Sequence, residues 1–521
     1  MFTRRKLLAF FAPVLALALW AACAAPVAPF SGGSGDAEPI HLVLLHTNDI
    51  HGQVLPRRAT WLDEEPPPLA GGLPRLAAAV QRVRREETDD VLLVDAGDWY
   101  QGTPEGMIDV GLSFVTGLAA LDYDAQSLGN HEFDHGLANV QRLLEQGTSV
   151  AVCANLRDPG TGERVDWVDP WRIVEAGGLR IALVGLLTTE TPDITHPDAR
   201  TLEFVDPVVA FTEARAELAG RADLFVPVGH IEIETGRGLV AAHPDLPVVV
   251  TGHSHTFLNE GVREGTTLVV QAGCKATVLG RVDLWIDPRS HTVLRSEARL
   301  IDLLDEPAAG DRLPDLEALC AGLVEESEVE MSKVMGELTR APSRSPLAGR
   351  RASSTVAGNW ICDAMRLRTG AEVALHNRGG TRVNLEAGLI SRRDLFELLP
   401  FDNDLVTMTL TGAELESVVR QSIADEDHAP LDYSGLRALV DAETLQLVRI
   451  EVAGEPLDPE REYRVTTSSF LAGGGDAYAA LVEGVGRITD PILMRDLMAL
   501  HLELEGRVTP AADERIVLIG D

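Results

Sequence analysis

The sequence predicts an α/β protein with a layered core, and three observations support this prediction. The chain has 521 residues, 45% of them apolar, and a mean hydropathy of +0.04. These values suit a soluble globular protein of about two or three domains. Short apolar segments recur through the first half of the chain, separated by segments with apolar residues at helical spacing. Alternation of buried strands and helices is typical of layered α/β folds.

The composition argues against two classes of function. The formal charge is −35, from 45 Lys and Arg against 80 Asp and Glu. A nucleic acid is bound through clustered cations, so we expect no nucleic-acid partner. The five cysteines include no C-x-x-C pair and are too few for a disulfide scaffold or a thiolate zinc site. Any metal site must therefore use His, Asp and Asn.

Residues 1–22 are expected to form a signal peptide. Arg4, Arg5 and Lys6 precede an apolar run, 7–22, that is short for a membrane span. This pattern predicts export to the periplasm or cell envelope, by either the general secretory or the twin-arginine route. Nothing in the sequence predicts an oligomeric state.

The apolar run ends in Leu-Trp-Ala-Ala-Cys, which resembles a bacterial lipoprotein box with Cys23 as the lipidated residue. Trp20 stands where an aliphatic residue is usual, so plain cleavage is the alternative. Residues 23–38 are rich in Ala, Pro, Gly and Ser and are expected to act as a tether. We expect contact with a membrane only through this anchor.

Five apolar segments are expected to be buried strands. They are His41–His46, Val91–Asp95, Ile181–Leu187, Leu224–Gly229 and Pro247–Thr251. The spacing of Leu73, Leu76, Ala77 and Val80 predicts a helix between the first two. In open α/β sheets, ligands bind at the carboxyl ends of the strands.

Side chains of metal-binding types follow four of these segments, all except Ile181–Leu187, and also the segment 126–128. They are Asp49, His51, Asp98, Asn130, His131, His230, His253 and His255. One histidine after a strand is more often structural, and Asp49 or Asp98 alone can cap a helix. Five such strand endings together predict a metal site. Imidazole and carboxylate ligands suit Zn, Mn, Fe or Co, and a shared carboxylate permits two divalent ions about 3.5 to 4 Å apart.

The order of these residues resembles that of a known superfamily. Asp-x-His, Gly-Asp, Gly-Asn-His-Glu, His and Gly-His-x-His occur in this order in the calcineurin-like metallophosphoesterases. Within that superfamily, segments 46–52, 95–104 and 129–134 are similar to bacterial periplasmic and animal ecto-5′-nucleotidases. The similarity spans about residues 40 to 490.

The resemblance implies two domains and a linker. An N-terminal layered α/β/β/α metallophosphoesterase domain is expected at 39–302, and a separate α/β substrate-binding domain at 334–521. Between them, 303–333 is acidic with helical spacing and is expected to be a mostly helical linker.

The resemblance also implies roles for the metal-site residues. One metal ion would be held by Asp49, His51, Asp98 and His255, and the other by Asp98, Asn130, His230 and His253. His131 would face the substrate phosphate, and Asp134 would hold its ring. The two ions would lower the pKa of a bound water enough to supply the attacking hydroxide at neutral pH. His46 is expected to be structural and His135 an exposed loop residue.

A glycine-rich loop at 377–382 follows a predicted strand, 373–376, and resembles the phosphate-binding loop of the nucleotidases. The resemblance assigns Arg351, Asn377 and Arg382 to the substrate phosphate. Arg350 is an alternative to its neighbour Arg351. Arg378 departs from the family, which has glycine there.

Two aromatic residues in loops are expected to bind a nucleobase. Phe401 and Phe470 lie in segments rich in Asp, Asn and Gly, whereas Phe396 has helical surroundings and is expected in the core. Stacking between two rings tolerates different bases. The resemblance places both rings at the base, with Asn403 beside them, and Asp476 at the ribose hydroxyls. The alternative is that both rings fold back onto their domain.

These observations predict an exported phosphohydrolase that removes phosphate from nucleoside 5′-monophosphates, with UDP-sugars as further substrates. The alternatives on the same metal centre are a 2′,3′-cyclic nucleotide phosphodiesterase and a thiosulfohydrolase. A surface lipoprotein without enzymatic activity would be expected to lack His131 or one of the metal ligands. The sequence keeps all of them, so this alternative is disfavoured.

Overall fold

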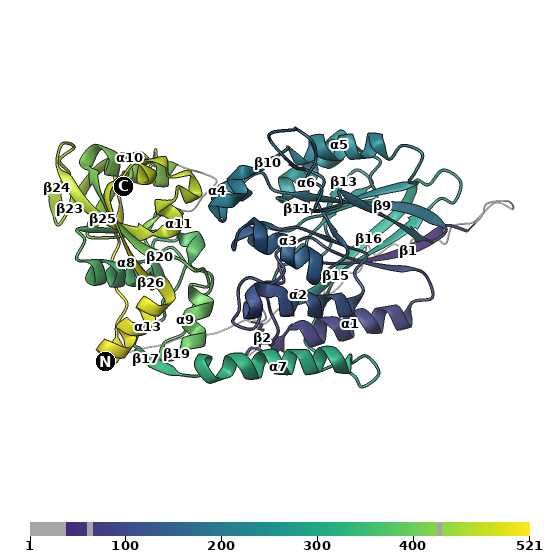
Figure 1. The fold of residues 1–521 in the computed structure, drawn as a ribbon, viewed down its shortest axis with the longest axis horizontal. Coiled ribbons are helices and arrows are strands. Elements are labelled where there is room, and N and C mark those ends of the chain that lie inside the picture. Colours follow the sequence, from purple (N-terminus) through teal and green to yellow (C-terminus); the bar gives the residue numbers. More distant parts are fainter. Residues whose placement is uncertain (1–37, 60–65, 425–429, 521) are drawn as a thin grey trace, which may run out of the picture. The chain divides into compact units, whose positions relative to one another are not determined.

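The computed structural model describes residues 38–59, 66–424 and 430–520 (Figure 1). The predicted signal peptide and Cys23 lie outside these ranges. Within them, no helix is both long enough and apolar enough to cross a membrane.

Two six-stranded sheets form the centre of the first half of the chain (Figure 1). The first has the order β16 (Val293–Asp302), β15 (Val278–Ile286), β1 (Ile40–Thr47), β4 (Val91–Asp95), β5 (Ala125–Ser127), β6 (Ala151–Val152). The second has the order β13 (Val262–Glu264), β14 (Thr267–Val270), β12 (Val248–Val250), β11 (Leu224–His230), β9 (Leu179–Leu187), β8 (Trp171–Ala176). All five predicted strands are confirmed.

The central strands of each sheet run parallel, so their carboxyl ends meet at one edge. The flanking strands β8, β13, β15 and β16 are antiparallel to their neighbours. Apolar side chains from both sheets, including Leu44 and Val94 from the first and Val226 and Val250 from the second, share one buried cluster. The two sheets therefore pack face to face.

Helices cover the outer face of each sheet and complete the predicted α/β/β/α layering (Figure 1). Leu76 and Val80 lie on the predicted helix, α1, and pack into the apolar cluster on the first sheet. Phe211 of α5 and Leu239 of α6 pack into the apolar cluster on the second sheet. The helices of this half are α1 (Leu73–Glu86), α2 (Leu112–Leu118), α3 (Leu137–Gln146), α4 (Thr191–Ile194), α5 (Pro207–Glu217) and α6 (Ile233–Ala242). This half also contains four short strands, β2 (Arg57–Arg58), β3 (Leu69–Ala70), β7 (Leu156–Arg157) and β10 (Glu203–Phe204).

The second half of the chain is a mixed α/β structure with three sheets. Its five-stranded sheet has the order β21 (Asp432–Ser434), β18 (Val373–His376), β25 (Glu462–Ser468), β20 (Asp404–Thr411), β26 (Val485–Leu493). The four-stranded sheet is β24 (Glu455–Pro456), β23 (Leu447–Val452), β22 (Leu436–Asp441), β28 (Ile516–Ile519). The three-stranded sheet is β19 (Gly388–Ser391), β17 (Val334–Leu338), β27 (Arg507–Val508).

Helices complete this half. They are α7 (Pro314–Met331), α8 (Val356–Thr369), α9 (Arg392–Leu398), α10 (Gly412–Ala424), α11 (Ser469–Ala472), α12 (Ala479–Val482) and α13 (Met494–Glu505). The start of α9 is a capping box: the Ser391 hydroxyl accepts from Asp394 N (3.3 Å), and the Asp394 carboxylate accepts from Ser391 N (2.7 Å). Phe396 on this helix is 7% exposed, as expected for a core residue.

Candidate metal centre and substrate site

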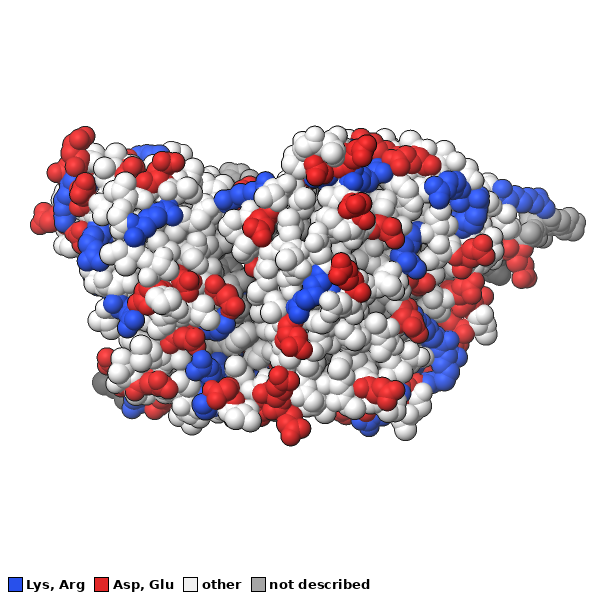
Figure 2. Space-filling view, in the orientation of Figure 1, with Lys and Arg blue, Asp and Glu red and all other residues white. Residues whose placement is uncertain are grey.

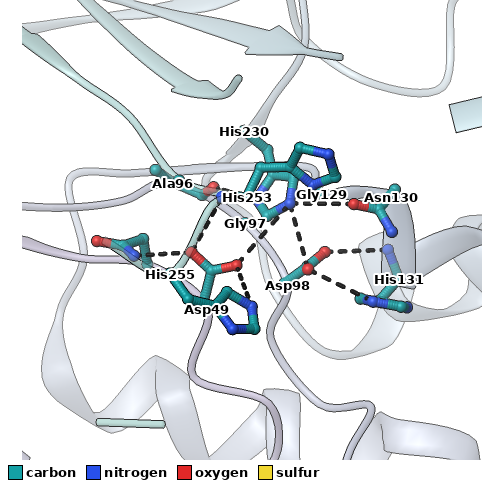
Figure 3. A network of polar contacts seen from close by, with 12 residues as sticks. Asp49, Ala96, Gly97, Asp98, Gly129, Asn130, His131, His230, His253 and His255 are labelled. Carbon is teal, nitrogen blue, oxygen red and sulfur yellow. Dashed lines mark hydrogen bonds and ion pairs between the residues drawn. The ribbon is translucent and has the colours of Figure 1, made fainter. Parts of the chain in front are cut away.

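Histidine and acidic side chains from separate loops converge at the carboxyl ends of the parallel strands (Figure 3). Asp49 and His51 follow β1, Asp98 follows β4, Asn130 opens the turn after β5, His230 ends β11, and His253 and His255 follow β12. The structure thus brings together the residues that the sequence predicts as metal ligands.

Asp98 lies between three imidazoles. Its Oδ2 is 3.2 Å from His230 Nε2 and 3.8 Å from both His51 Nε2 and His131 Nε2. Asp49 Oδ1 is 3.2 Å from His255 Nε2, 3.8 Å from His51 Nε2 and 4.0 Å from His230 Nε2. Both carboxylates approach His51 and His230, so these side chains form one continuous cluster.

Asn130 and His253 occupy different positions around His230. Asn130 Oδ1 is 3.1 Å from His230 Nε2, at the centre. The His253 ring lies 5.1 Å from the His230 ring, but its Nε2 is 3.5 Å from Glu190 and 3.7 Å from Glu232. His253 is therefore adjacent to the predicted ligand set, while its Nε2 lies against carboxylates outside it.

The ligand loops have unusual backbone conformations. Asp49, His51, Asp98, His253 and His255 all have positive φ, between 51° and 69°. Such conformations are costly for residues other than glycine and cluster at functional sites. Gly97, at φ +90°, lies so close to the next loop that an added Cβ would be 2.6 Å from Gly129 N. The motif glycines therefore let the Asp98 and Asn130 loops approach each other.

Backbone carbonyls orient two of the ligand imidazoles. His51 Nδ1 donates to Gln101 O and His230 Nδ1 to Ala96 O, each at 2.8 Å. A donating Nδ1 leaves Nε2 as the metal-binding atom, which is the usual way in which a neighbouring group fixes the tautomer of a metal ligand.

Two residues that the sequence interpretation did not single out hold the ligand loops. The buried Glu132 carboxylate accepts from the backbone N–H groups of Asp98, Trp99 and Gly129 at 2.7 to 3.0 Å. Burial, together with Asp98, raises the pKa of Glu132 to about 8. Asn48 donates to Asp49 Oδ2 and to Gly273 O, both at 2.7 Å. Both residues lie inside the quoted motifs, but their side chains bind backbone and ligand groups, which sequence spacing alone does not reveal.

The charges at the centre fit divalent cations. Burial opposes ionisation of Asp49, yet His255 and His230 lower its pKa to about 2. Burial favours neutral His230, yet Asp98 and Asp49 raise its pKa to about 10. Asp49 Oδ1 is buried and accepts no hydrogen bond among the described residues. Two buried carboxylates that require positive neighbours, surrounded by imidazoles, are a suitable donor set for Zn, Mn, Fe or Co.

His131 lies in the same cluster of side chains and also contacts the second half of the chain. Its Nδ1 is 2.7 Å from Asp134 Oδ2, and its backbone N–H donates to Asp98 Oδ1 at 3.0 Å. Its ring stacks on Phe401 with centroids 5.5 Å apart. His131 Nε2 is thus held at the edge of the centre, next to a residue of the predicted base site.

Two further histidines lie nearby in the chain. His46 is 1% exposed, and its ring packs so tightly on Gly280 that an added Cβ there would overlap it, in agreement with the structural role predicted. The prediction of an exposed His135 is wrong. His135 is half-buried, because its Nδ1 lies 2.9 Å from the hydroxyl of the buried Tyr100.

Several predicted substrate residues meet in pairs in the second half of the chain. Asn377 Nδ2 donates to Asp476 Oδ2 at 3.1 Å. The Arg382 guanidinium lies 5.7 Å from the centre of the Phe401 ring, a cation–π arrangement. Ser469, the neighbour of Phe470, donates to Asn403 Oδ1 at 3.4 Å.

Two predicted substrate residues have other surroundings than the sequence suggested. Phe470 lies in the short helix α11, not in a loop, and its ring packs on Gly475 and on the domain core while remaining partly exposed. Arg351 Nη1 donates to Ile423 O at 3.2 Å, near the end of α10. Arg382 therefore has the more direct connection to the metal centre, since it stacks on the ring that covers His131.

Comparison with known proteins identifies a known domain in each half of the chain. Residues 42–257 match the model of the calcineurin-like phosphoesterases, and residues 334–483 match that of the 5′-nucleotidase C-terminal domain. The chain carries a calcineurin-like phosphoesterase domain followed by a 5′-nucleotidase C-terminal domain. It is therefore a metal-dependent phosphoesterase with an N-terminal metallophosphoesterase domain and a separate C-terminal nucleotidase domain.

Relatives cover nearly the whole chain. The 5′-nucleotidase of Bos taurus is 28% identical over 85% of this chain and 84% of its own. Protein UshA of Escherichia coli is 26% identical over 89% and 90%. The crystal structure of a 5′-nucleotidase precursor from Thermus thermophilus superposes with a TM-score of 0.82 at 28% identity, covering 92% of this chain and 100% of that one.

Arg378, which departs from the 5′-nucleotidase family pattern, forms a buried ion pair. Its guanidinium contacts both oxygens of Asp432 at 3.1 and 3.2 Å and donates to the backbone oxygens of Arg351 and Ser353. Asp432 also accepts from Thr355 N and Oγ1, at the start of α8. Because these acceptors occupy the guanidinium, Arg378 holds the Arg351 loop to the domain.

We expect Arg378→Met to lower the free energy of unfolding by about 3 to 5 kcal/mol, because it leaves the Asp432 charge buried without its partner. Urea unfolding followed by circular dichroism measures this change. Lys333→Met is the control, since Lys333 pairs with Glu330 on the exposed surface and its loss should not move the unfolding midpoint. Equal midpoints for wild type and Arg378→Met would contradict the assignment.

Proposed function

We propose that this protein removes the phosphate from nucleoside 5′-monophosphates, with UDP-sugars as further substrates, at a centre of two divalent metal ions. The observation that carries the proposal is the stacking of His131, at the metal centre, on Phe401, in the predicted base site. This contact joins the phosphate-cleaving chemistry of one domain to a substrate-recognition loop of the other. A general phosphatase has no need for such a loop.

The ligand assignments follow from the geometry and the family resemblance. One ion would be held by Asp49, His51, Asp98 and His255, and the other by Asp98, Asn130, His230 and His253, with Asp98 as the bridge. For the second set, the His253 Nε2 has to turn from Glu190 and Glu232 toward the centre. When bound, the two ions supply positive charge for the phosphoryl oxygens and lower the pKa of water.

The protein's own groups would complete the reaction. His131, held by Asp134 at 2.7 Å, would donate a hydrogen bond from Nε2 to a phosphoryl oxygen or to the leaving 5′ oxygen. The carboxylate of Asp134 would fix the orientation of the ring for this role. Asn377 and the arginines, Arg382 in particular, would hold the phosphate in line with the attacking oxygen.

The nucleoside would be recognised in the C-terminal domain. Phe401 and Phe470 are both partly exposed and would stack on the base, with Asn403 connecting their segments through Ser469. Asp476 would accept hydrogen bonds from the ribose hydroxyls, and its present partner Asn377 would keep it in position. We also propose that the protein is exported and anchored through Cys23.

The test is a phosphate-release panel with AMP, UDP-glucose, 2′,3′-cyclic AMP and bis(4-nitrophenyl) phosphate, each with Mn, Zn, Co or Mg. We expect the highest kcat/KM for AMP. Preference for 2′,3′-cyclic AMP, or no release from any nucleotide, would overturn the proposal. Thiosulfohydrolase activity is tested by sulfate release from a cysteine S-thiosulfonate, and we expect none.

We expect Phe470→Ala to raise KM for AMP by about 5- to 150-fold, because about 1 to 3 kcal/mol of base stacking is lost. 4-Nitrophenyl phosphate is the control substrate, because it has neither base nor ribose and should be hydrolysed by the variant near the wild-type rate. An equal loss for both substrates would indicate a packing defect around Gly475, and the base site would then be withdrawn.

A further inference from the structure

Arg200 forms hydrogen bonds to both domains. It lies in the 3₁₀ helix Pro197–Thr201, and its guanidinium donates to Gly473 O at 2.9 Å through Nη1 and to Gly474 O at 3.2 Å through Nη2. Its Nε donates to Pro192 O, in α4 of its own domain, at 3.1 Å. Three directed hydrogen bonds define the orientation of the planar guanidinium. Arg200 therefore connects the metallophosphoesterase domain directly to the C-terminal domain.

The contacts of Arg200 differ from those of other surface arginines. On the face drawn in Figure 2, basic and acidic side chains are interspersed, and arginines such as Arg215 and Arg237 pair with carboxylates. Arg200 is exposed too, but the acceptors of its three hydrogen bonds are backbone carbonyls, two of them in the other domain. These contacts depend on the path of the backbone at 473–474 and not on a charged partner.

The two carbonyls belong to a turn, residues 473–476, that we call the nucleoside turn because it contacts groups of the proposed nucleoside site. Gly475 packs on the ring of Phe470, since an added Cβ would lie 2.4 Å from Phe470 Cζ. Asp476 is part of the turn and accepts from Asn377 Nδ2 at 3.1 Å. A shift of the nucleoside turn would therefore move Phe470 and Asp476 with it.

Hydrogen bonds within the C-terminal domain define the shape of the nucleoside turn. Gly473 N donates to Ser469 O at 2.9 Å, and Gly474 N donates to Leu471 O at 3.0 Å. These bonds do not involve Arg200. The contribution of Arg200 is therefore the position of the turn relative to the other domain.

The segment that carries this arginine, 188–201, also contacts residues of the metal centre. It follows β9, the predicted strand to which no metal ligand is assigned. Thr188 N donates to His230 O at 2.9 Å, and Glu190 Oε2 is 3.5 Å from His253 Nε2. The segment thus contacts two assigned metal ligands near its start and the nucleoside turn near its end.

A fixed distance between the two sites matters for a substrate that has to reach both. In the proposed function, the phosphate lies at the metal ions and the base lies in the C-terminal domain. When two binding sites are held at the spacing of the ligand, the second contact forms at a high effective concentration. Loss of the fixed spacing weakens binding of the whole ligand, whereas a fragment that occupies one site is unaffected.

We propose that Arg200 is a positioning residue for nucleotide recognition, which holds the nucleoside turn at the distance from the metal ions that a nucleoside 5′-monophosphate spans. This inference rests on the proposed function. Arg200 acts through Phe470 and Asp476 and does not itself bind the phosphate or the base. The metallophosphoesterase domain thereby contributes to recognition of the nucleoside as well as to cleavage of the phosphate ester.

The experiment compares Arg200→Met, Arg200→Lys and the control Arg84→Met in the full chain. Arg84 also donates to two backbone carbonyls, Leu121 O at 2.6 Å and Asp122 O at 2.8 Å, but within one domain. Calorimetric titration of the metal-loaded proteins measures the affinity for the methylene phosphonate analogue of AMP, for adenosine and for inorganic phosphate. Steady-state kinetics measure KM and kcat for AMP and 4-nitrophenyl phosphate.

We expect Arg200→Met to bind the analogue about 5- to 20-fold more weakly, as for loss of two charge-assisted hydrogen bonds at an exposed site. The affinities for adenosine and for phosphate should stay within about twofold of the wild-type values, because each fragment occupies one domain. KM for AMP should rise by the same factor as for the analogue, and KM for 4-nitrophenyl phosphate should not change. Arg200→Lys should recover part of the affinity, because an ammonium group lacks the guanidinium fork. Arg84→Met should match the wild type.

The outcomes separate positioning from a structural role. Unchanged affinity of Arg200→Met for the analogue overturns the inference. An equal loss of affinity for adenosine and for the analogue also overturns it, because Arg200 would then shape the base site itself. So does a wild type that binds the analogue no more tightly than phosphate. If the wild type releases phosphate from no nucleotide, the proposed function fails, whereas the three titrations still decide the role of Arg200.

Discussion

Asp98→Asn is expected to lose bound metal and to lower kcat/KM for AMP by about 10³-fold or more. Asp98 Oδ2 lies within 3.8 Å of the Nε2 atoms of His51, His131 and His230, and this carboxylate is the assigned bridge between the two ions. An amide keeps the size of the side chain but removes the negative charge that both ions share. Elemental analysis of the purified variant and steady-state kinetics measure the two effects.

Two further variants distinguish loss of the bridging Asp98 carboxylate from nonspecific damage to the protein. His255→Ala should weaken mainly one ion, because His255 approaches Asp49 and not Asp98, and excess metal should restore part of its activity. Asp245→Asn makes the same chemical change at the surface, where Asp245 pairs with Arg215, and should keep full metal content and activity. Wild-type activity in Asp98→Asn would refute the two-metal centre.

Much of the fold was predictable because strands buried between two layers have a strong local pattern. Continuous apolar runs identified β1, β4, β9, β11 and β12, and their parallel arrangement explains why the residues after them meet. The antiparallel strands β15 and β16 were not predicted. Polar residues, Arg295, Ser296 and Glu297 among them, interrupt the sequence of β16, so the strand lacks a continuous apolar run.

The sequence allowed us to name the residues of the candidate site, but not the directions of their side chains. The ligands could be named because each follows a strand within a short motif. The direction of His253 Nε2 depends on Glu190 and Glu232, which come from distant segments.

Predictions for single loop residues failed where a tertiary contact decided the outcome. His135 was expected to be exposed because it lies in a polar turn, but Tyr100 from another loop contacts its ring. Phe470 was expected in a loop because glycines follow it, yet Ser468 caps a short helix by accepting from Leu471 N at 3.2 Å. The sequence contains the capping residue Ser468 before Phe470, but the glycines after Phe470 favoured the prediction of a loop.

His131→Ala is expected to keep two equivalents of metal while kcat falls by about 10² to 10⁴-fold. The His131 ring is held from two sides, by Asp134 at Nδ1 and by Phe401 across its face. Its Nε2 is 3.8 Å from Asp98 Oδ2, the same distance as the Nε2 of His51. The family resemblance assigns His131 to the phosphoryl group, so we expect its removal to affect the chemical step more than metal binding.

Two matched variants test this assignment. Asp134→Asn should have a milder effect than His131→Ala, because it changes only the contact that orients the imidazole. His135→Ala removes an imidazole from the same turn, and because that ring contacts Tyr100 and not the centre, kcat should stay close to the wild-type value. Loss of one metal equivalent in His131→Ala would make His131 a ligand. The groups proposed to donate to the phosphoryl oxygens would then be Asn377 and the arginines, Arg382 in particular.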